Sequence, residues 1–275
     1  MGWQKSDNSR VNDPRLTLVH GSNPLLSKVM WTNKYGRATD GLQLTATDIW
    51  DRADSSATQQ IWVAPTQARI HNITSSSTQD DGNPEGAGSG AQAVRVYGLQ
   101  TWDSKETSED VVLNGTADVA TQNSYVIIHR MKVIPVGSTY GINAGNITAT
   151  AVTDGTVTAQ ITAGEGQTLM AIYGIASTQT AYMTKYQINA HNTGNPSTVV
   201  ESDVTVLVNE RPDLDETVFL NKSNAGLIAS GTTDIIREFN PYLKIEGPAI
   251  IKVQGIATLV DTEGVAEFDV ILVDD

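Results

Sequence analysis

Histidines are the first residues in this sequence that could do acid–base or metal chemistry, because imidazole titrates near neutral pH and binds metals. The sequence contains four: His20, His71, His129 and His191. None lies in an H-E-x-x-H motif or in a pair at metal-ligand spacing. His129 alternates with apolar residues in a predicted strand, so we expect a core or interface histidine. His191 is expected in an exposed loop.

Nucleophiles and phosphate-binding loops are not indicated either. The sequence has no G-x-S-x-G motif, and the absence of cysteine excludes thiol nucleophiles, disulfides and cysteine-bound metals. Residues 86–91 match G-x-G-x-x-[GA], but they precede a predicted strand rather than a helix, which is the wrong context for a phosphate site. We therefore predict no catalytic residue and no enzymatic activity.

Acidic side chains are numerous, and two clusters could in principle hold a hard cation. Residues 80–85 and 213–216 are both rich in carboxylates, but neither has the ligand spacing of a known calcium loop. Both are expected to be solvated turns. A glycosidase pair cannot be chosen from sequence, because the separation of two carboxylates depends on the fold. We predict no metal and no cofactor.

Tryptophans and basic residues in the first forty positions point to a binding surface for another protein. Trp50 and Trp62 fall in strand patterns and are expected in the core, whereas Trp3 and Trp31 lie where little core is available and are candidate anchors. This stretch is also basic in an acidic chain, which would steer it to an acidic partner surface. The candidate partner-binding residues are Trp3, Arg10, Arg15, Trp31, Lys34 and Arg37.

Composition and charge narrow the class of protein. The 275 residues carry a formal net charge of −13, which argues against broad binding to nucleic acids or anionic membranes. No apolar run approaches the ~20 residues of a membrane span, and the N-terminal residues lack the apolar segment of a signal peptide. We expect no nucleic-acid partner and no membrane.

The elements that must position these residues are strands. Period-two alternation and β-branched residues recur from about residue 42, helical periodicity is nearly absent, and polar turns separate the segments. We predict an all-β fold, an antiparallel β-sandwich or jelly roll, with an N-terminal arm (residues 1–40) on a body (residues 41–275). The arm could lie on a partner or on its own domain. A short helix is expected within 212–220 or near 40–54.

Two hairpins are predicted within the body. Residues 169–175 and 181–188 are separated by a polar pentapeptide, which is typical of a hairpin. The dipeptide Asp154-Gly155 predicts a two-residue turn that sets Val152 opposite Val157. That second hairpin has little apolar surface, so it is expected to pack on a neighbour as an inserted subdomain near 145–165.

Four segments resemble virion structural proteins of tailed bacteriophages: residues 46–52 (ATDIWDR), 60–65 (QIWVAP), 124–131 (SYVIIHRM) and 164–174 (GEGQTLMAIYG). The resemblance extends from about Trp31 to the C-terminus. In such phages, β-rich proteins of this size are often capsid cement (decoration) proteins, typically jelly-roll trimers. The resemblance implies a homotrimer that binds the major capsid protein on the capsid surface, is made in the bacterial cytoplasm, and has no catalytic residue.

Other functions stay open on the sequence alone. The chain could be another virion component, such as a tail, neck or fibre-base protein, which copy number would separate from a cement protein. It could also be a carbohydrate-binding adhesin that uses Trp102, Tyr97 or Tyr140 as sugar platforms. A glycoside hydrolase is a further alternative.

Overall fold

The computed structural model describes residues 29–52, 59–84, 88–137, 141–192, 199–214, 217–229, 232–259 and 262–275. Within these ranges the chain forms sixteen strands and one 3-10 turn, Pro212–Leu214, which falls in a stretch predicted to be helical. The predicted all-β class is confirmed. No helix in the described ranges is long and apolar enough to cross a membrane.

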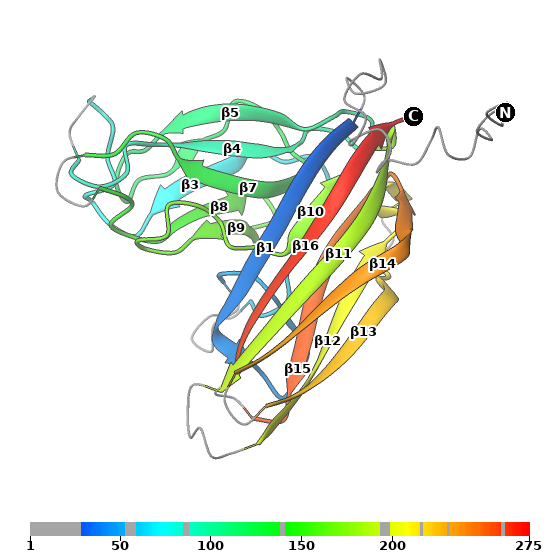
Figure 1. Ribbon diagram of the computed structural model, residues 1–275. Coiled ribbons are helices and arrows are strands. Elements are labelled where there is room, and N and C mark those ends of the chain that lie inside the picture. Colours follow the sequence, from blue (N-terminus) through cyan, green and yellow to red (C-terminus); the bar gives the residue numbers. More distant parts are fainter. Residues whose placement is uncertain are drawn as a thin grey trace, which may run out of the picture.

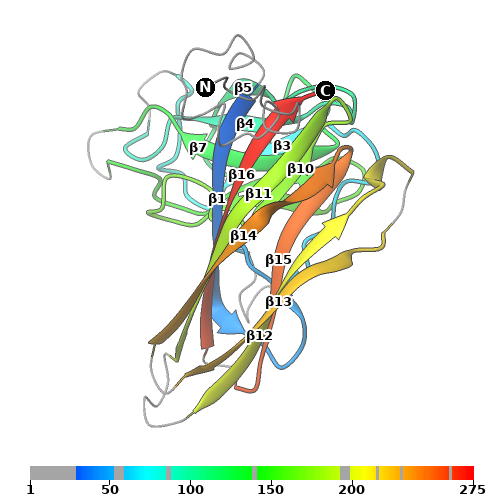
Figure 2. The same cartoon turned by 45° about the vertical axis from the view of Figure 1, so that its right-hand side comes forward.

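The larger body is a jelly roll of two packed antiparallel sheets (Figures 1 and 2). One sheet has the order β1-β16-β11-β14 and the other β10-β15-β12-β13, with β2 added to β15. Counted in chain order without β2, the sheets read 1-8-3-6 and 2-7-4-5, the strand order of a jelly roll. Its strands are β1 (Val29–Leu42), β2 (Thr47–Asp48), β10 (Ile172–Ile175), β11 (Gln179–Asn192), β12 (Val200–Asn209), β13 (Leu220–Ala229), β14 (Thr232–Glu246), β15 (Ala249–Ala257) and β16 (Thr262–Asp274).

Period-two alternation explains why these strands enclose a core. In β16, Ala266, Phe268, Val270 and Leu272 are all buried, as their alternation predicts. In the opposite sheet, the even-numbered valines of β12 are buried in the same way. Strands β12 and β16 therefore each turn one apolar face toward the other sheet.

The smaller body is inserted between β2 and β10 of the jelly roll (Figure 1). It contains a four-stranded sheet, β6-β3-β8-β9, and a three-stranded sheet, β5-β4-β7. We call it the inserted domain. Its strands are β3 (His71–Ser75), β4 (Ala93–Leu99), β5 (Thr107–Val112), β6 (Val119–Ala120), β7 (Ile127–Val133), β8 (Ile147–Ala151) and β9 (Val157–Ile161). The insertion is thus much larger than the hairpin that the sequence predicts near 145–165.

The predicted hairpin of residues 169–188 is wrong. Strand β10 pairs with β15 in one sheet, whereas β11 pairs with β14 and β16 in the other. The connection begins with a tight turn in which the amide of Gln179 donates to the carbonyl of Ala176. Both strands have buried residues that fit a hairpin pattern, but the chain uses the turn to cross from one layer of the sandwich to the other.

The predicted register of the second hairpin is also wrong. Val157 lies opposite Thr150 rather than Val152, and the ladder shifts register between Ala149 and Thr150. The Asp154 carboxylate is held outside the hairpin, because it accepts hydrogen bonds from the amide of Thr66 at 2.8 Å and the Arg69 side chain at 3.0 Å. These contacts favour a longer loop over the two-residue turn.

The boundary of the N-terminal arm also changes. Residues 29–40 belong to β1, which pairs with β16 from Val29↔Val273 onward. The sequence left open whether this stretch lies on a partner or on its own domain. Residues 29–40 lie on their own domain. Residues 1–28, including the candidate residues Trp3, Arg10 and Arg15, lie outside the described residues.

Candidate functional site

The joint between the jelly roll and the inserted domain holds a group of buried ionisable side chains. Lys34 of β1 is buried, and its ammonium donates a hydrogen bond to the main-chain carbonyl of His129 in β7. Arg130 donates in the other direction, to the carbonyl of Asn33 at 3.1 Å. The predicted role of Lys34 in partner binding is therefore corrected: it binds the chain's own inserted domain, and burial keeps it from other proteins.

Burial and neighbouring charges set the protonation of the ionisable groups in this joint. His129 Nε2 lies 2.6 Å from Glu106 Oε2, and the His129 ring lies 4.4 Å from the Tyr173 ring. Burial lowers the pKa of His129, so the ring is neutral and Nε2 donates to the carboxylate. Burial, helped by the nearby Arg130 guanidinium, lowers the pKa of Lys34 to about 7. Burial opposes the ionisation of Glu106, but the hydrogen bond to His129 and nearby positive charges outweigh it and lower its pKa.

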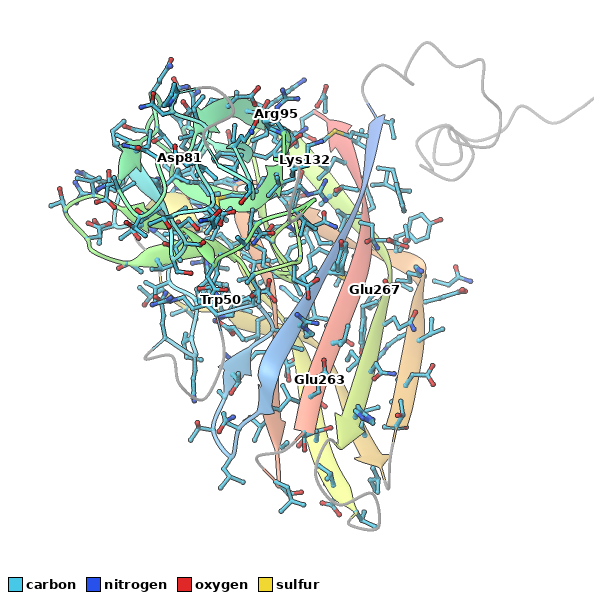
Figure 3. The ribbon with its side chains drawn as sticks, turned by 90° about the vertical axis from the view of Figure 1, so that its left-hand side faces the viewer. Trp50, Asp81, Arg95, Lys132, Glu263 and Glu267 are labelled. Carbon is cyan, nitrogen blue, oxygen red and sulfur yellow. The ribbon has the colours of Figure 1, made fainter. Side chains whose placement is uncertain are left out.

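Arg37 makes a second link across the joint. Its guanidinium lies 2.8 Å from Glu165 Oε1 and 3.8 Å from Asp51 Oδ1. Trp50, next to Asp51, lies at the base of the inserted domain (Figure 3). Like Lys34, Arg37 is thus paired within the chain rather than free for the predicted partner.

Asp51 is the least satisfied group of this link. Its carboxylate is buried, and within the described residues Oδ1 has no hydrogen-bond partner. Burial raises the pKa of Asp51 to about 6, although the charge of Arg37 opposes the shift. At pH 7 the folded protein therefore still carries mostly the ionised form, but burying that charge costs free energy relative to the unfolded state.

Asp51→Asn is expected to raise the free energy of unfolding at pH 7 by about 1–2 kcal/mol, because a neutral side chain avoids burying the charge. A folded-state pKa raised above the unfolded value means that wild-type stability falls as pH rises from about 4 to 6. The advantage of Asn is thus absent below about pH 4. Urea unfolding of both proteins at pH 4 and pH 7 measures this, and an equal difference at the two pH values would contradict it.

The other histidines show no site either. His71 is buried against Tyr125, and burial lowers its pKa to about 4. His191 Nδ1 lies 2.8 Å from the Thr232 hydroxyl at the end of a strand, not in a loop as predicted. The burial predicted for His129 is confirmed, and His20 lies outside the described residues. In the part of the chain that the structure describes, no group of three or more His, Asp or Glu side chains could hold a metal.

The acidic cluster at residues 80–85 differs from the predicted solvated turn. Asp80 is fully buried and accepts hydrogen bonds from the amides of Ala91, Ala144 and Gly145 at 2.7–2.8 Å and from the Ser75 hydroxyl at 2.6 Å. One carboxylate thus ties three loop segments together. In the second cluster, Asp213 forms an exposed ion pair with Arg211, as a solvated turn would.

The tryptophans and tyrosines named in the sequence analysis lie partly in the core and partly on the surface. Trp50 and Trp62 are buried as predicted. Trp102 packs against the core, and Lys132 lies 5.6 Å from the Tyr97 ring centre, so neither ring is a free sugar platform. Tyr140 lies outside the described residues. Trp31, in contrast, is 56% exposed.

Trp31 belongs to an apolar row on the outer face of the first sheet. It pairs with Ile271 of β16, which pairs in turn with Tyr182 of β11. Met30, the preceding residue, is 43% exposed but belongs to the other face of β1, opposite the buried Leu272. Farther along β16, the outer face becomes charged: Glu267 lies beside Lys185 at 3.4 Å (Figure 3). The apolar row is therefore confined to the end of the jelly roll where β1 begins.

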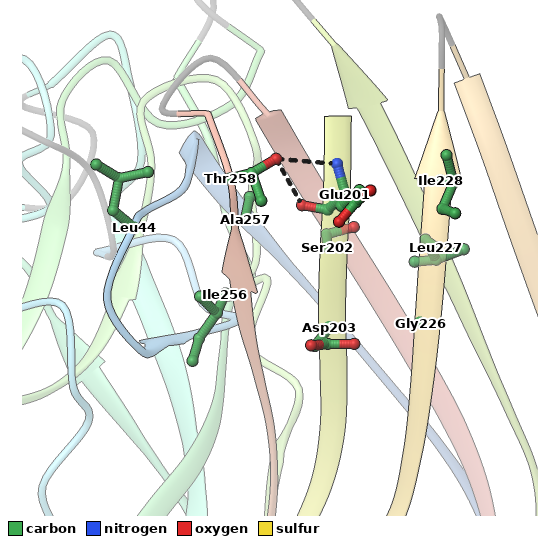
Figure 4. A pocket seen from close by; sticks show the side chains of 10 residues that line it. All are labelled: Leu44, Glu201, Ser202, Asp203, Gly226, Leu227, Ile228, Ile256, Ala257 and Thr258. Atoms are coloured by element: carbon green, nitrogen blue, oxygen red, sulfur yellow. Dashed lines mark hydrogen bonds between the residues drawn. The ribbon is translucent and has the colours of Figure 1, made fainter. Parts of the chain in front are cut away.

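A groove of about 640 Å³ lies at the opposite end, on the outer face of the second sheet (Figure 4). Leu44, Ile228 and Ile256 are 62%, 70% and 44% exposed in it. Between them, β12 presents the exposed carboxylates of Glu201 and Asp203. Sequence reasoning missed this groove, because its residues come from three strands and a loop that are distant in sequence.

The fold defines an all-β class, a jelly roll with a β-domain inserted after its first long strand. No family model and no curated protein matches the chain. Among solved structures, it is similar to a chain of the infectious bursal disease virus Gt strain (11% identity, 96% of this chain and 78% of that one, TM-score 0.27). It is similar to a chain of cowpea mosaic virus top component, naturally occurring empty particles (9% identity, 78% and 83%, TM-score 0.23). A tandem CBM22 domain of Paenibacillus barcinonensis Xyn10C shows 9% identity, coverage of 89% and 93%, and a TM-score of 0.22.

These likenesses are distant. Identities of 9–11% and TM-scores below 0.3 mean that the chain superposes poorly on each of these structures. They include both viral capsid chains and a carbohydrate-binding module, so they do not favour one function. The function proposed below rests on other observations.

Proposed function

We propose that this protein is a structural component of a bacteriophage virion, a trimeric cement protein that binds the outside of the capsid and stabilises the assembled shell. In this proposal it is not an enzyme, and its partners are the major capsid protein and further copies of itself. The resemblance of four segments to tailed-phage virion proteins supports the proposal. The jelly-roll fold is compatible with it, because viral capsid proteins use that fold, although lectins and cupins do too.

The observation that carries the proposal is the exposure of Trp31, which lies beside the buried Ile271 at the end of this sheet. A tryptophan with more than half its surface in water costs hydrophobic free energy unless a partner covers it, and Trp is enriched among residues that dominate protein interfaces. Trp31 lies on a paired strand of the sheet, within the stretch predicted to be a basic arm. A rigid anchor of this kind loses little conformational entropy on binding.

Bound copies would stabilise the shell by mass action, because they bind only the assembled state. Three equivalent contacts on one trimer would multiply a modest affinity into avidity. The acidic surface expected from the net charge of −13 would not compete for nucleic acid.

Binding to capsids that lack the protein tests this function. We expect purified wild-type protein to bind such shells at hundreds of copies and to raise the temperature at which they release DNA. Trp31→Ala is expected to lower the affinity at least tenfold, as an interface anchor would.

Val112→Ala, at a similarly exposed position on the inserted domain, serves as the matched control and is expected to bind like wild type. Occupancy by a handful of copies would instead indicate a tail, neck or fibre-base protein. Full decoration by Trp31→Ala would show that this residue is not the anchor.

A further inference from the structure

The groove on the second sheet combines an apolar rim with two carboxylates. Across the outer face, Ile228 pairs with Glu201, and Asp203 lies between Gly226 and Ile256 (Figure 4). Gly226 has no side chain, so the Asp203 carboxylate lies close over it; a Cβ at this position would come within 3.3 Å of Asp203 Oδ1. Such a surface suits an extended segment that carries both aliphatic side chains and a cation.

Two short segments of this kind lie outside the described residues; residues 25–28, Leu-Leu-Ser-Lys, directly precede β1, and the other lies farther from it. Residues 15–19, Arg-Leu-Thr-Leu-Val, combine an arginine with three aliphatic side chains. They belong to the stretch 1–28, which has four basic and two acidic residues in a chain whose net charge is −13. The charge of this segment is therefore complementary to Glu201 and Asp203.

Chain length decides whose segment can reach the groove. Strand β1 begins at Val29, at the end of the jelly roll where the C-terminus lies, and the groove lies beyond the other end of β1, beside Leu44 (Figures 1 and 4). Fourteen residues of β-strand span about 45 Å, and the outer face of the opposite sheet lies at least about 10 Å away at right angles, so the direct distance is at least about 46 Å before the path bends around the sandwich. Leu16 and Leu18 precede Val29 by 13 and 11 positions, so they reach about 47 and 40 Å when fully extended, which leaves a segment of the same chain no slack for that detour.

We infer that the groove binds residues 15–19 of a second copy of this chain. Arg15 pairs with the carboxylates of β12, and the aliphatic side chains cover Ile228 and Ile256. Because donor segment and acceptor groove are different surfaces, the contact is heterologous and can close a ring of copies. The inference depends on the self-association in the proposed function, but it does not depend on capsid binding.

Cross-linking between two different chains tests the inference directly. The native chain has no cysteine, so Leu16→Cys and Ile228→Cys each introduce a single thiol. The two variants are mixed without capsids, allowed to exchange subunits, and treated with a short bismaleimide. We expect a covalent dimer that contains both variants. Val112→Cys, exposed on the inserted domain, replaces Ile228→Cys as the control and is expected to give none.

Charge reversal provides an independent measurement. Asp203→Lys and Arg15→Asp are each expected to weaken self-association at least tenfold in sedimentation experiments, and the double variant to restore most of it. Asp234→Lys, on exposed strand β14, is the control for a surface charge change and is expected to associate like wild type.

Each other outcome overturns the inference. If the Leu16→Cys and Ile228→Cys variants sediment together as trimers but form no cross-link, the trimer forms without this contact. A cross-link formed only inside one chain carrying both thiols would show that the segment folds back. A protein that is monomeric at all concentrations would contradict both this contact and the proposed trimer. Capsid binding through Trp31 is measured in a separate experiment and would not be contradicted by that result.

Discussion

Lys252→Met is expected to lower the free energy of unfolding by about 3–5 kcal/mol, because it leaves a buried carboxylate without its counter-ion. Lys252 Nζ lies 2.8 Å from Asp48 Oδ2, and both side chains are almost completely buried. Asp48 also accepts hydrogen bonds from the Trp62 amide and the Gln254 side chain, each at 2.8 Å. Burial raises the pKa of Asp48 against the effect of these partners.

The double variant Asp48→Asn/Lys252→Met makes this prediction specific to the ion pair. It removes both charges and keeps a side-chain oxygen that can accept the hydrogen bond from the Trp62 amide. We expect it to recover more than half of the free energy of unfolding that Lys252→Met loses. Urea unfolding at pH 7 measures all three proteins.

Lys185→Met is the matched control at the surface. Lys185 lies 3.3 Å from Asp269 but is 35% exposed, so we expect a cost below about 1 kcal/mol. If Lys252→Met cost no more than this control, the buried pair would not contribute as described. The pair joins β2 to β15, so its loss would loosen the jelly roll near the point where the inserted domain begins.

The second large effect is a dependence of stability on pH that comes from Lys34. Its folded-state pKa of about 7 lies below the unfolded value of about 10.4, so the unfolded state binds more protons between these two pH values. Stability therefore rises with pH through this window, by up to about 1.4 kcal/mol per pH unit, and the contribution is constant below and above it. The physical cause is burial, helped by Arg130 in the same joint.

Lys34→Met is expected to remove this slope and to be more stable than wild type at pH 7, since the desolvated ammonium is gone. Urea unfolding at pH 7, 8 and 9 gives the difference between the two proteins at each pH. Lys105→Met, which removes an exposed lysine, serves as the control and is expected to keep the wild-type slope. A difference between wild type and Lys34→Met that does not change with pH would contradict the prediction.

The sequence alone determined those features that depend on the alternation of neighbouring residues. The buried faces of β12 and β16, the burial of His129, Trp50 and Trp62, and the all-β class all follow from a period of two along each strand. This signal is local: a side chain's face depends on its nearest neighbours in the strand. The exposed Trp31 was also expected, because little core is available near the beginning of the chain.

Only the tertiary structure decided which strands share a sheet and which polar groups meet. The segments on either side of residues 176–178 match a hairpin pattern, yet they enter opposite sheets, because both layers accept buried strands equally well. Lys34 and Arg37 have the composition of a docking arm, but they bind the His129 carbonyl and Glu165, which are 95 and 128 positions away in the chain. The groove at Asp203 likewise exists only where β12, β13 and β15 lie side by side. Such pairings depend on contacts between distant segments, and no periodicity within one segment encodes them.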